Sequence, residues 1–133
     1  AGTVRTDDPS LTVRHVTGRD PLRVVLGHAP ADAKIQPAVE LSGDLGEVLD
    51  ELGRRDVVQL LVEGGATVAH DLHAAGLVDR YVVYLAPALM GGDDGVSLFR
   101  GRGASTIDDV WRGRIVAVTR LGDDVRIDLE GPR

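Results

Sequence analysis

The feature that most constrains the fold is an apolar run that ends in a Glu-Gly-Gly turn and is followed by a helical pattern. Val57 to Val62 reads VVQLLV, which is typical of a buried β-strand. Glu63-Gly64-Gly65 comes next, and residues 66–75 form a helical segment that ends at Gly76, a residue suited to the position after a helix. A strand, a tight turn and a helix in this order predict an α/β fold.

The rest of the chain continues this alternation. A helix is expected at 45–52, with Asp44 as its N-cap, because its apolar residues share one face. Strands are expected at 22–26, 38–41, 81–86, 115–121 and 125–129. Gly122-Asp123-Asp124 joins the last two and predicts a hairpin. We therefore predict one α/β domain over residues 1–133, with a mainly parallel sheet flanked by helices and a C-terminal antiparallel hairpin.

Composition excludes several functional classes. The net charge is −6, and no Lys/Arg cluster offers a surface for nucleic acid or an anionic membrane. No apolar run approaches the roughly 20 residues of a membrane span, and no secretory signal pattern is present. With 0 cysteines, disulfides, thiol catalysis and cysteine metal sites are excluded. A soluble, cytoplasmic protein is expected.

The Glu-Gly-Gly turn is the strongest chemical signal. A helix N-terminus presents unpaired N–H groups and a partial positive charge, and two adjacent glycines let a pyrophosphate approach the backbone. Glu63 stands at the carboxyl end of the predicted strand, where open α/β sheets place their ligands. The G-x-G-x-x-G spacing of an ordinary dinucleotide site is missing, so Gly64-Gly65 fits a plain tight turn equally well.

The opening segment is the second signal, because it gathers polar groups around Pro9. Arg14 could clamp a phosphate with two hydrogen bonds. Asp7 and Asp8 could orient a hydroxyl or, less favourably, hold Mg²⁺. Taken alone, the segment is better explained as a polar loop in which Asp8-Pro9 makes a turn.

The other candidate motifs give weaker indications of a functional site. The GGDDG loop at 91–95 lacks the spacing and final glutamate of an EF-hand, so a flexible glycine loop is expected. His70 and His73 are neighbours on the predicted helix, but no further ligand joins them, so zinc is not expected. Trp111 is expected to pack under the C-terminal hairpin. Neither a G-x-S-x-G motif nor a P-loop is present.

Four segments carry a family resemblance. They are GTVRTDDPSLTVR at 2–14, PLRVVLG at 21–27, LLVEGGATVAHDLHAAGLVDRYVVYLAPALMGG at 60–92, and the closing hairpin. In this order they resemble the reductase domain of the bifunctional riboflavin-biosynthesis deaminase–reductase, which has the dihydrofolate-reductase-like fold. The resemblance implies reduction of 5-amino-6-(5-phosphoribosylamino)uracil to its ribitylamino product by NADPH, with the proton coming from a carboxylic acid or water.

The resemblance also implies roles for individual residues. Leu11 and Arg14 would contact the substrate, Arg14 at its phosphate, and Glu63 would hydrogen-bond the substrate near the reacting carbon. The cofactor would be held on its nicotinamide–ribose side by Thr3 and Asp7. Its pyrophosphate would be held by the glycine turn and the start of the helix that follows, namely Gly64, Gly65, Ala66, Thr67 and Asp71.

Two departures from the family pattern affect these expectations. The family usually has Asp-Ser after the LRVVL strand, near the adenosine 2′-phosphate, where this chain has Gly27-His28, so His28 or an arginine from elsewhere would take that role. The family's reductase domain also begins with a strand and a helix of roughly 30 residues or more before Gly2. Without that unit the sheet has unpaired backbone groups, so either reduced stability or compensation by a homodimer is expected.

Two further functions stay open. One is a reductase of the same fold that acts on another pyrimidine or on a pterin. The other is a non-catalytic, reductase-like dimerisation module.

Overall fold

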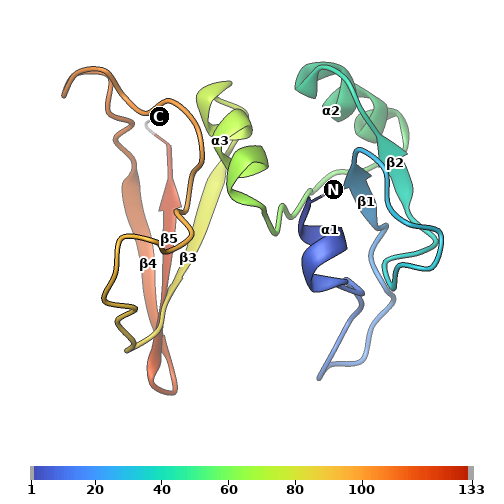
Figure 1. The fold of residues 1–133 in the computed structure, drawn as a ribbon, viewed down its shortest axis with the longest axis horizontal. Helices are drawn as coiled ribbons and strands as arrows, with labels where there is room; N and C mark the ends of the chain where they lie inside the picture. The colour runs from blue at the N-terminus through green and yellow to red at the C-terminus, as the bar shows by residue number, and fades with distance from the viewer. Residues whose placement is uncertain (1, 132–133) are drawn as a thin grey trace. The chain divides into compact units, whose positions relative to one another are not determined.

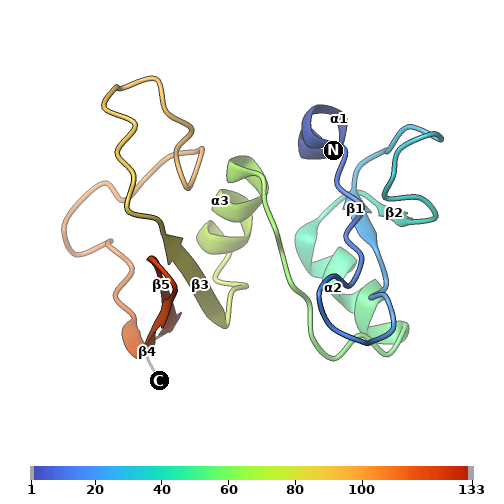
Figure 2. The ribbon, with the colours of Figure 1, turned by 90° about the horizontal axis from the view of Figure 1, so that it is seen from below.

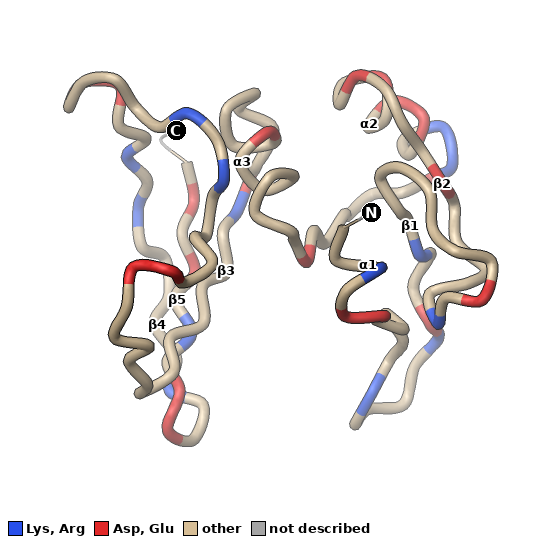
Figure 3. The backbone as a smooth tube through the Cα atoms, viewed as in Figure 1, with Lys and Arg blue, Asp and Glu red and all other residues tan. Residues whose placement is uncertain are grey.

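The computed structural model describes residues 2–131, and the chain divides into two compact units, residues 1–65 and 66–133 (Figure 1). Within each unit, acidic and basic residues are interspersed along the backbone (Figure 3), in agreement with the absence of a basic cluster from the sequence. Across the residues that the structure describes, we find no helix long and apolar enough to cross a membrane.

The first unit is built on a short parallel pair of strands. β1 (Val24–Leu26) pairs with β2 (Val39–Leu41), with Val25 opposite Glu40, so both predicted strands are confirmed with shorter bounds. The chain opens on α1 (Gly2–Asp7), a helix that the sequence reading did not predict. Its one buried residue joins the core, which consists of Val4, Val25, Ala29 and Ile35.

α2 (Leu45–Arg54) confirms the predicted helix and its cap. The Asp44 carboxylate accepts hydrogen bonds from the backbone N–H groups of Gly46 (2.8 Å) and Glu47 (3.2 Å), which otherwise have no partner in the first turn. Val48 and Leu52, four residues apart, are buried on the same face. The apolar spacing in the sequence therefore located this helix correctly.

The prediction of a strand at Val57–Val62 is wrong. The segment is neither strand nor helix, and Val58 is 97% exposed and Leu61 74% exposed. Its first residue is tied to α2, since the Val57 N–H donates to the Leu52 carbonyl. Within the described part of the chain, no backbone hydrogen bond joins residues 58–62 to a neighbouring strand. An apolar, β-branched run has strand propensity, but a strand requires a neighbour to pair with.

The second unit is an antiparallel sheet with one helix beside it (Figure 2). Its strands, in the spatial order β3-β5-β4, are β3 (Arg80–Leu85), β4 (Arg114–Leu121) and β5 (Asp124–Glu130). The predicted hairpin is confirmed: Leu121 pairs with Asp124 across a two-residue turn in which Gly122 has φ +64°. The expected mainly parallel sheet needs correction, because among the described strands only β1 and β2 pair in parallel.

α3 (Ala66–Ala74) confirms the helix predicted after the glycine turn. Gly76 has φ +69°, and its N–H donates to the His73 carbonyl while the Leu77 N–H donates to the Leu72 carbonyl. This pair of bonds is the Schellman arrangement, which closes a helix with a left-handed glycine. The helix therefore ends where its sequence predicts.

An aromatic cluster fastens α3 to β3. His73 Nδ1 and the Tyr81 hydroxyl are 2.7 Å apart, and the His73 ring stacks on Phe99 with centroids at 4.9 Å. Trp111 meets Tyr81 edge-on, also with centroids at 4.9 Å. Trp111 thus packs on β3, the strand that pairs with β5 of the C-terminal hairpin. The cluster also anchors the long loop between β3 and β4 through Phe99.

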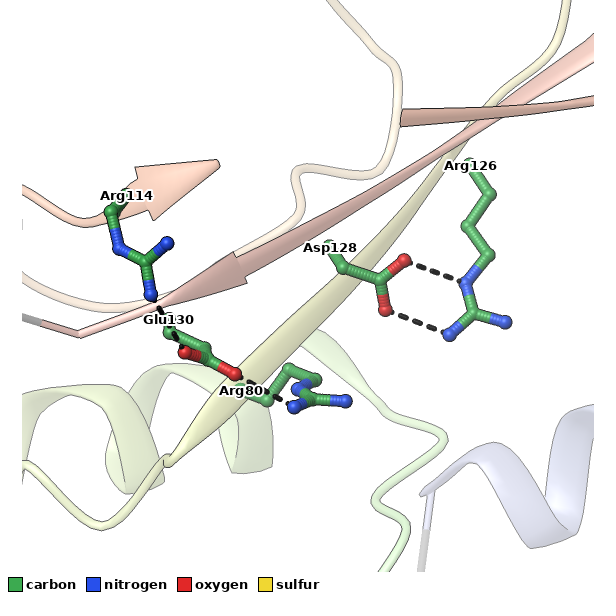
Figure 4. A network of polar contacts seen from close by, with 5 residues as sticks. All are labelled: Arg80, Arg114, Arg126, Asp128 and Glu130. Carbon is green, nitrogen blue, oxygen red and sulfur yellow. Dashed lines mark hydrogen bonds and ion pairs between the residues drawn. The ribbon is translucent and has the colours of Figure 1, made fainter. Parts of the chain in front are cut away.

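Ion pairs on one face of the sheet link all three strands (Figure 4). Glu130 of β5 pairs with Arg80 of β3 (2.7 Å) and with Arg114 of β4 (3.3 Å). On the same strand, the Arg126 guanidinium donates hydrogen bonds to both carboxylate oxygens of buried Asp128, at 3.0 and 2.7 Å. Hydrogen bonds from Arg126 hold the pKa of Asp128 below its ordinary value.

Candidate functional site

The two motifs singled out from the sequence come together at Thr3 and Gly65. A β-carbon built on Gly65 would lie only 2.9 Å from the Thr3 hydroxyl oxygen, so the side chain of α1 abuts the glycine turn directly. Both residues belong to the first unit and both are half-buried. A larger residue at position 65 would therefore force the Thr3 side chain or the backbone to shift.

Gly64 has the opposite environment. It is exposed, its φ is +118°, and a β-carbon there would meet no atom within 4 Å. The Gly64–Gly65 peptide bond is cis. The backbone at Gly64 is thus uncovered immediately before α3, which leaves room for a ligand group to approach it. An exposed glycine backbone directly before a helix N-terminus has the chemistry that binding of a pyrophosphate requires.

The predicted residues of α3 differ in their surroundings. Ala66 is half-buried and begins the helix, and its carbonyl accepts a hydrogen bond from the Arg100 N–H at 2.9 Å. Thr67 is exposed. Asp71 is also exposed, and its carboxylate is 3.1 Å from His70 Nδ1. Asp71 therefore has a partner on its own helix.

His70 fastens a loop to α3. Its Nε2 lies 3.0 Å from the Arg102 carbonyl, and Gly101 packs directly against the imidazole ring. The hydrogen bond to Arg102 and then that to Asp71 raise the pKa of His70 above its ordinary value of 6.5. The sequence reading missed this role, because it tested the two histidines only as metal ligands.

In the opening segment, Asp8 links that segment to Lys34 within the first unit. Its φ is +42°, and its carboxylate accepts from the Lys34 N–H (2.8 Å) and pairs with Lys34 Nζ (3.3 Å). The hydrogen bond from the Lys34 backbone holds the pKa of Asp8 below its ordinary value. Among the described residues, no group of three or more His, Cys, Asp or Glu side chains could hold a metal ion, so the Mg²⁺ alternative finds no support.

The remaining predicted residues leave their functional groups available. Leu11 has φ +46° and packs against the core of the first unit, which fixes the chain just before Arg14. The side chains of Asp7, Arg14 and Glu63 are exposed and make no hydrogen bond or ion pair with other described residues. A guanidinium without a partner suits a phosphate ligand. The structure does not show these three side chains in contact with one another.

A charged pair that the sequence reading did not identify follows β1. His28 Nδ1 lies 2.5 Å from Glu40 Oε2. Glu40 Oε1 accepts from the Ala29 N–H at 3.1 Å and from Gln36 Nε2 at 3.4 Å. These hydrogen bonds, that from Ala29 first, hold the pKa of Glu40 below its ordinary value. The sequence alone points to His28 but not to Glu40, because only the parallel pairing of β1 and β2 brings the two residues together.

The fold and this site define a class of protein, an α/β domain with the dihydrofolate-reductase-like fold. In a solved structure of RibD from Acinetobacter baumannii, the matching region has a TM-score of 0.87 and 25% identity, covering 98% of this chain and 45% of that one. Residues 1–127 match the family described as the RibD C-terminal domain. The chain belongs to this family, which confirms the resemblance drawn from the sequence.

Two curated relatives show how much of a longer protein the chain represents. The riboflavin biosynthesis protein RibD of Mycobacterium tuberculosis is 34% identical, covering 96% of this chain but 40% of that protein. The 2,5-diamino-6-ribosylamino-4(3H)-pyrimidinone 5′-phosphate reductase of Methanothermobacter thermautotrophicus is 29% identical, covering 95% of this chain and 74% of that protein. The chain thus spans less than half the length of the RibD relative.

Proposed function

We propose that the chain is a reductase of riboflavin biosynthesis, which reduces the ribosyl group of 5-amino-6-(5-phosphoribosylamino)uracil to the ribitylamino product with NADPH. The observation that carries the proposal is the close approach of Thr3 to Gly65, which joins the opening motif to the glycine turn. Support also comes from the family match and from relatives that are named as reductases.

Bound NADPH would supply a hydride and a carboxylic acid or water the accompanying proton, so the main task of the chain is to bind and orient the reactants. Thr3 and Asp7 would hold the nicotinamide–ribose side of the cofactor. The pyrophosphate would be held by the uncovered backbone at Gly64, by Gly65 and by the first turn of α3 at Ala66 and Thr67. Since Asp71 is a carboxylate with a partner on its own helix, we assign it an indirect role there, in holding His70.

The substrate residues would lie in the first unit. Arg14, exposed and without an ion-pair partner among the described residues, would bind the substrate phosphate. Leu11 would pack against the substrate, and Glu63 would accept a hydrogen bond from it. An exposed arginine and a phosphate monoester are chemically matched, and the packing of Leu11 against the core of the first unit holds that segment in place despite its positive φ.

A second candidate substrate is 2,5-diamino-6-ribosylamino-4(3H)-pyrimidinone 5′-phosphate. The observation in its favour is that two relatives are named as reductases of this compound. It carries the same ribose phosphate and differs in the pyrimidine ring, so Arg14 would serve either substrate. The choice between the two substrates would then depend on residues that contact the pyrimidine ring, and Glu63 is our candidate for such a residue.

The experiment is to follow NADPH oxidation by the intact chain with each pyrimidine separately, and to measure NADPH binding by calorimetry in parallel. We expect NADPH to bind, and one pyrimidine to be reduced with one NADPH consumed per product. NADPH binding without turnover of either compound would point to another pyrimidine or a pterin. A folded chain that binds no NADPH would contradict the proposal and favour the non-catalytic module. The expected homodimer stays a prediction, which sedimentation equilibrium tests.

A further inference from the structure

His28 and Glu40 form a hydrogen-bonded pair at the parallel strands β1 and β2, with His28 beyond the carboxyl end of β1. β1 and β2 run in parallel, so their carboxyl ends meet at one edge, and His28 follows β1 directly after Gly27. Ligands of open α/β sheets bind at this edge. In dinucleotide sites generally, a carboxylate near the end of the second strand takes a ribose 2′-hydroxyl, whereas an arginine accommodates a 2′-phosphate. Glu40 lies on the second strand of this pair.

The hydrogen bonds of Glu40 determine which nitrogen of the His28 ring is available to a ligand. Glu40 is held as an ionised carboxylate by Ala29, His28 and Gln36. An ionised carboxylate can only accept, so His28 Nδ1 carries the proton in the 2.5 Å contact. The His28 side chain is 78% exposed, and its other ring nitrogen, Nε2, has no partner among the described residues. Nε2 is therefore the atom offered to a ligand.

The charge of the pair decides which ligand it suits. Even when His28 is protonated, the adjacent carboxylate brings the sum of their charges to zero. No lysine or arginine is among the residues bonded to Glu40 or His28. A phosphate dianion would gain little from such a neutral pair, while a hydroxyl can bond to imidazole nitrogen in either protonation state.

The geometry points to Glu40 as the residue that limits this chain's preference for a 2′-phosphorylated cofactor, acting through His28. The inference rests on the proposed function. NADPH and NADH should bind with dissociation constants that differ by less than about tenfold, and Glu40 is a positioning and charge-setting residue in that selectivity. His28 is the residue that meets the ribose.

The test measures the dissociation constants of NADPH and NADH by calorimetry for the intact chain and three variants. Glu40→Gln removes one negative charge and should shift the ratio of the two constants toward NADPH by about three- to tenfold, the size expected for one charge acting across an exposed site. His28→Ala removes the imidazole that is hydrogen-bonded to the Glu40 carboxylate, which leaves that negative charge more exposed, and should shift the ratio toward NADH. Asp50→Asn, on the exposed surface of α2, makes the same charge change elsewhere and should leave the ratio unchanged.

The outcomes separate this inference from the proposed function. If the intact chain binds both cofactors and neither Glu40→Gln nor His28→Ala moves the ratio, the inference is overturned while the proposed function stands. If the unsubstituted chain binds neither cofactor, both are overturned. Because His28 is exposed, His28→Ala should fold normally, and it decides the question even if Glu40→Gln loses the Ala29 contact and unfolds.

Discussion

The Thr3 hydroxyl occupies the space that a side chain on Gly65 would need, with only 2.9 Å between that oxygen and the position of a β-carbon. The contact joins residues separated by most of the first unit. It also links two of the four segments that carry the resemblance to the reductase family, residues 2–14 and 60–92. The space available at position 65 thus depends on the side chain at position 3, which makes the relationship open to a double-mutant cycle.

We expect Gly65→Ala to lower the free energy of unfolding by about 1–3 kcal/mol, because the added methyl group collides with Thr3. Thr3→Ala in the same chain should recover most of that loss. Urea denaturation of the single and double variants gives the coupling energy. Gly53→Ala is the control: it adds a methyl group to α2 where no atom lies within 4 Å, and it should be neutral or slightly stabilising. Additive effects of the two substitutions would show that the contact does not matter.

Arg14→Ala should weaken binding of the phosphorylated substrate by tenfold or more, since a charge-assisted hydrogen bond is lost. The dephosphorylated substrate should bind equally to both chains. Calorimetric titration with the two compounds makes the comparison. Arg19→Ala, another exposed arginine in the same unit, is the matched control. If Arg14→Ala weakened binding of both compounds equally, Arg14 would contribute through its charge or through folding and not through contact with the phosphate.

His70 should make the docking of residues 100–102 on α3 depend on pH. The pKa of His70 is raised in the folded chain, so its contribution to stability is complete below its ordinary pKa of 6.5 and is lost as the pH rises through the higher folded pKa. The stability difference between the unsubstituted chain and His70→Asn should therefore shrink from pH 6 to pH 8. Thermal unfolding across this range measures it, with His15→Asn as the control, because His15 is exposed. A difference that is constant with pH would refute the assignment.

Asp128 should contribute to stability in the opposite pH range. Arg126 lowers the pKa of Asp128 below its ordinary 3.8, so the contribution is present above that value and is lost as the pH falls through the lower folded pKa. Asp128→Asn should therefore lower the unfolding temperature at pH 6 and have less effect in strong acid. Asp123→Asn, in the exposed hairpin turn, should change neither. Equal destabilisation at both pH values would mean that packing, not charge, explains the loss.

Elements with local signals were predictable from the sequence. Asp44 before an apolar helical pattern located α2, Gly76 located the end of α3, and Gly122 located the hairpin turn, because each acts within a few residues. The family resemblance, which the comparisons confirm, rested on long matching strings of residues and needed no structure.

What the sequence could not provide depends on contacts between distant residues. The run from Val57 to Val62 has the composition of a strand, but its structure depends on a partner that composition does not reveal. The pairing of His28 with Glu40 requires β1 and β2 to lie side by side. α1 was missed because its six residues include a glycine and two threonines, which have weak helix propensity; it is held in place by burial of Val4 in the core.

The exposed run at 57–62 has a practical consequence for work with this protein. Six consecutive uncharged residues with high β-propensity and no proline or glycine are the pattern that promotes amyloid-like stacking between chains. Arg54, Arg55 and Asp56 precede the run and Glu63 follows it, so charged gatekeepers flank it on both sides. Neutralising these flanking charges should shorten the lag before thioflavin-T-positive fibrils form, which makes them the positions to preserve when the chain is engineered for expression.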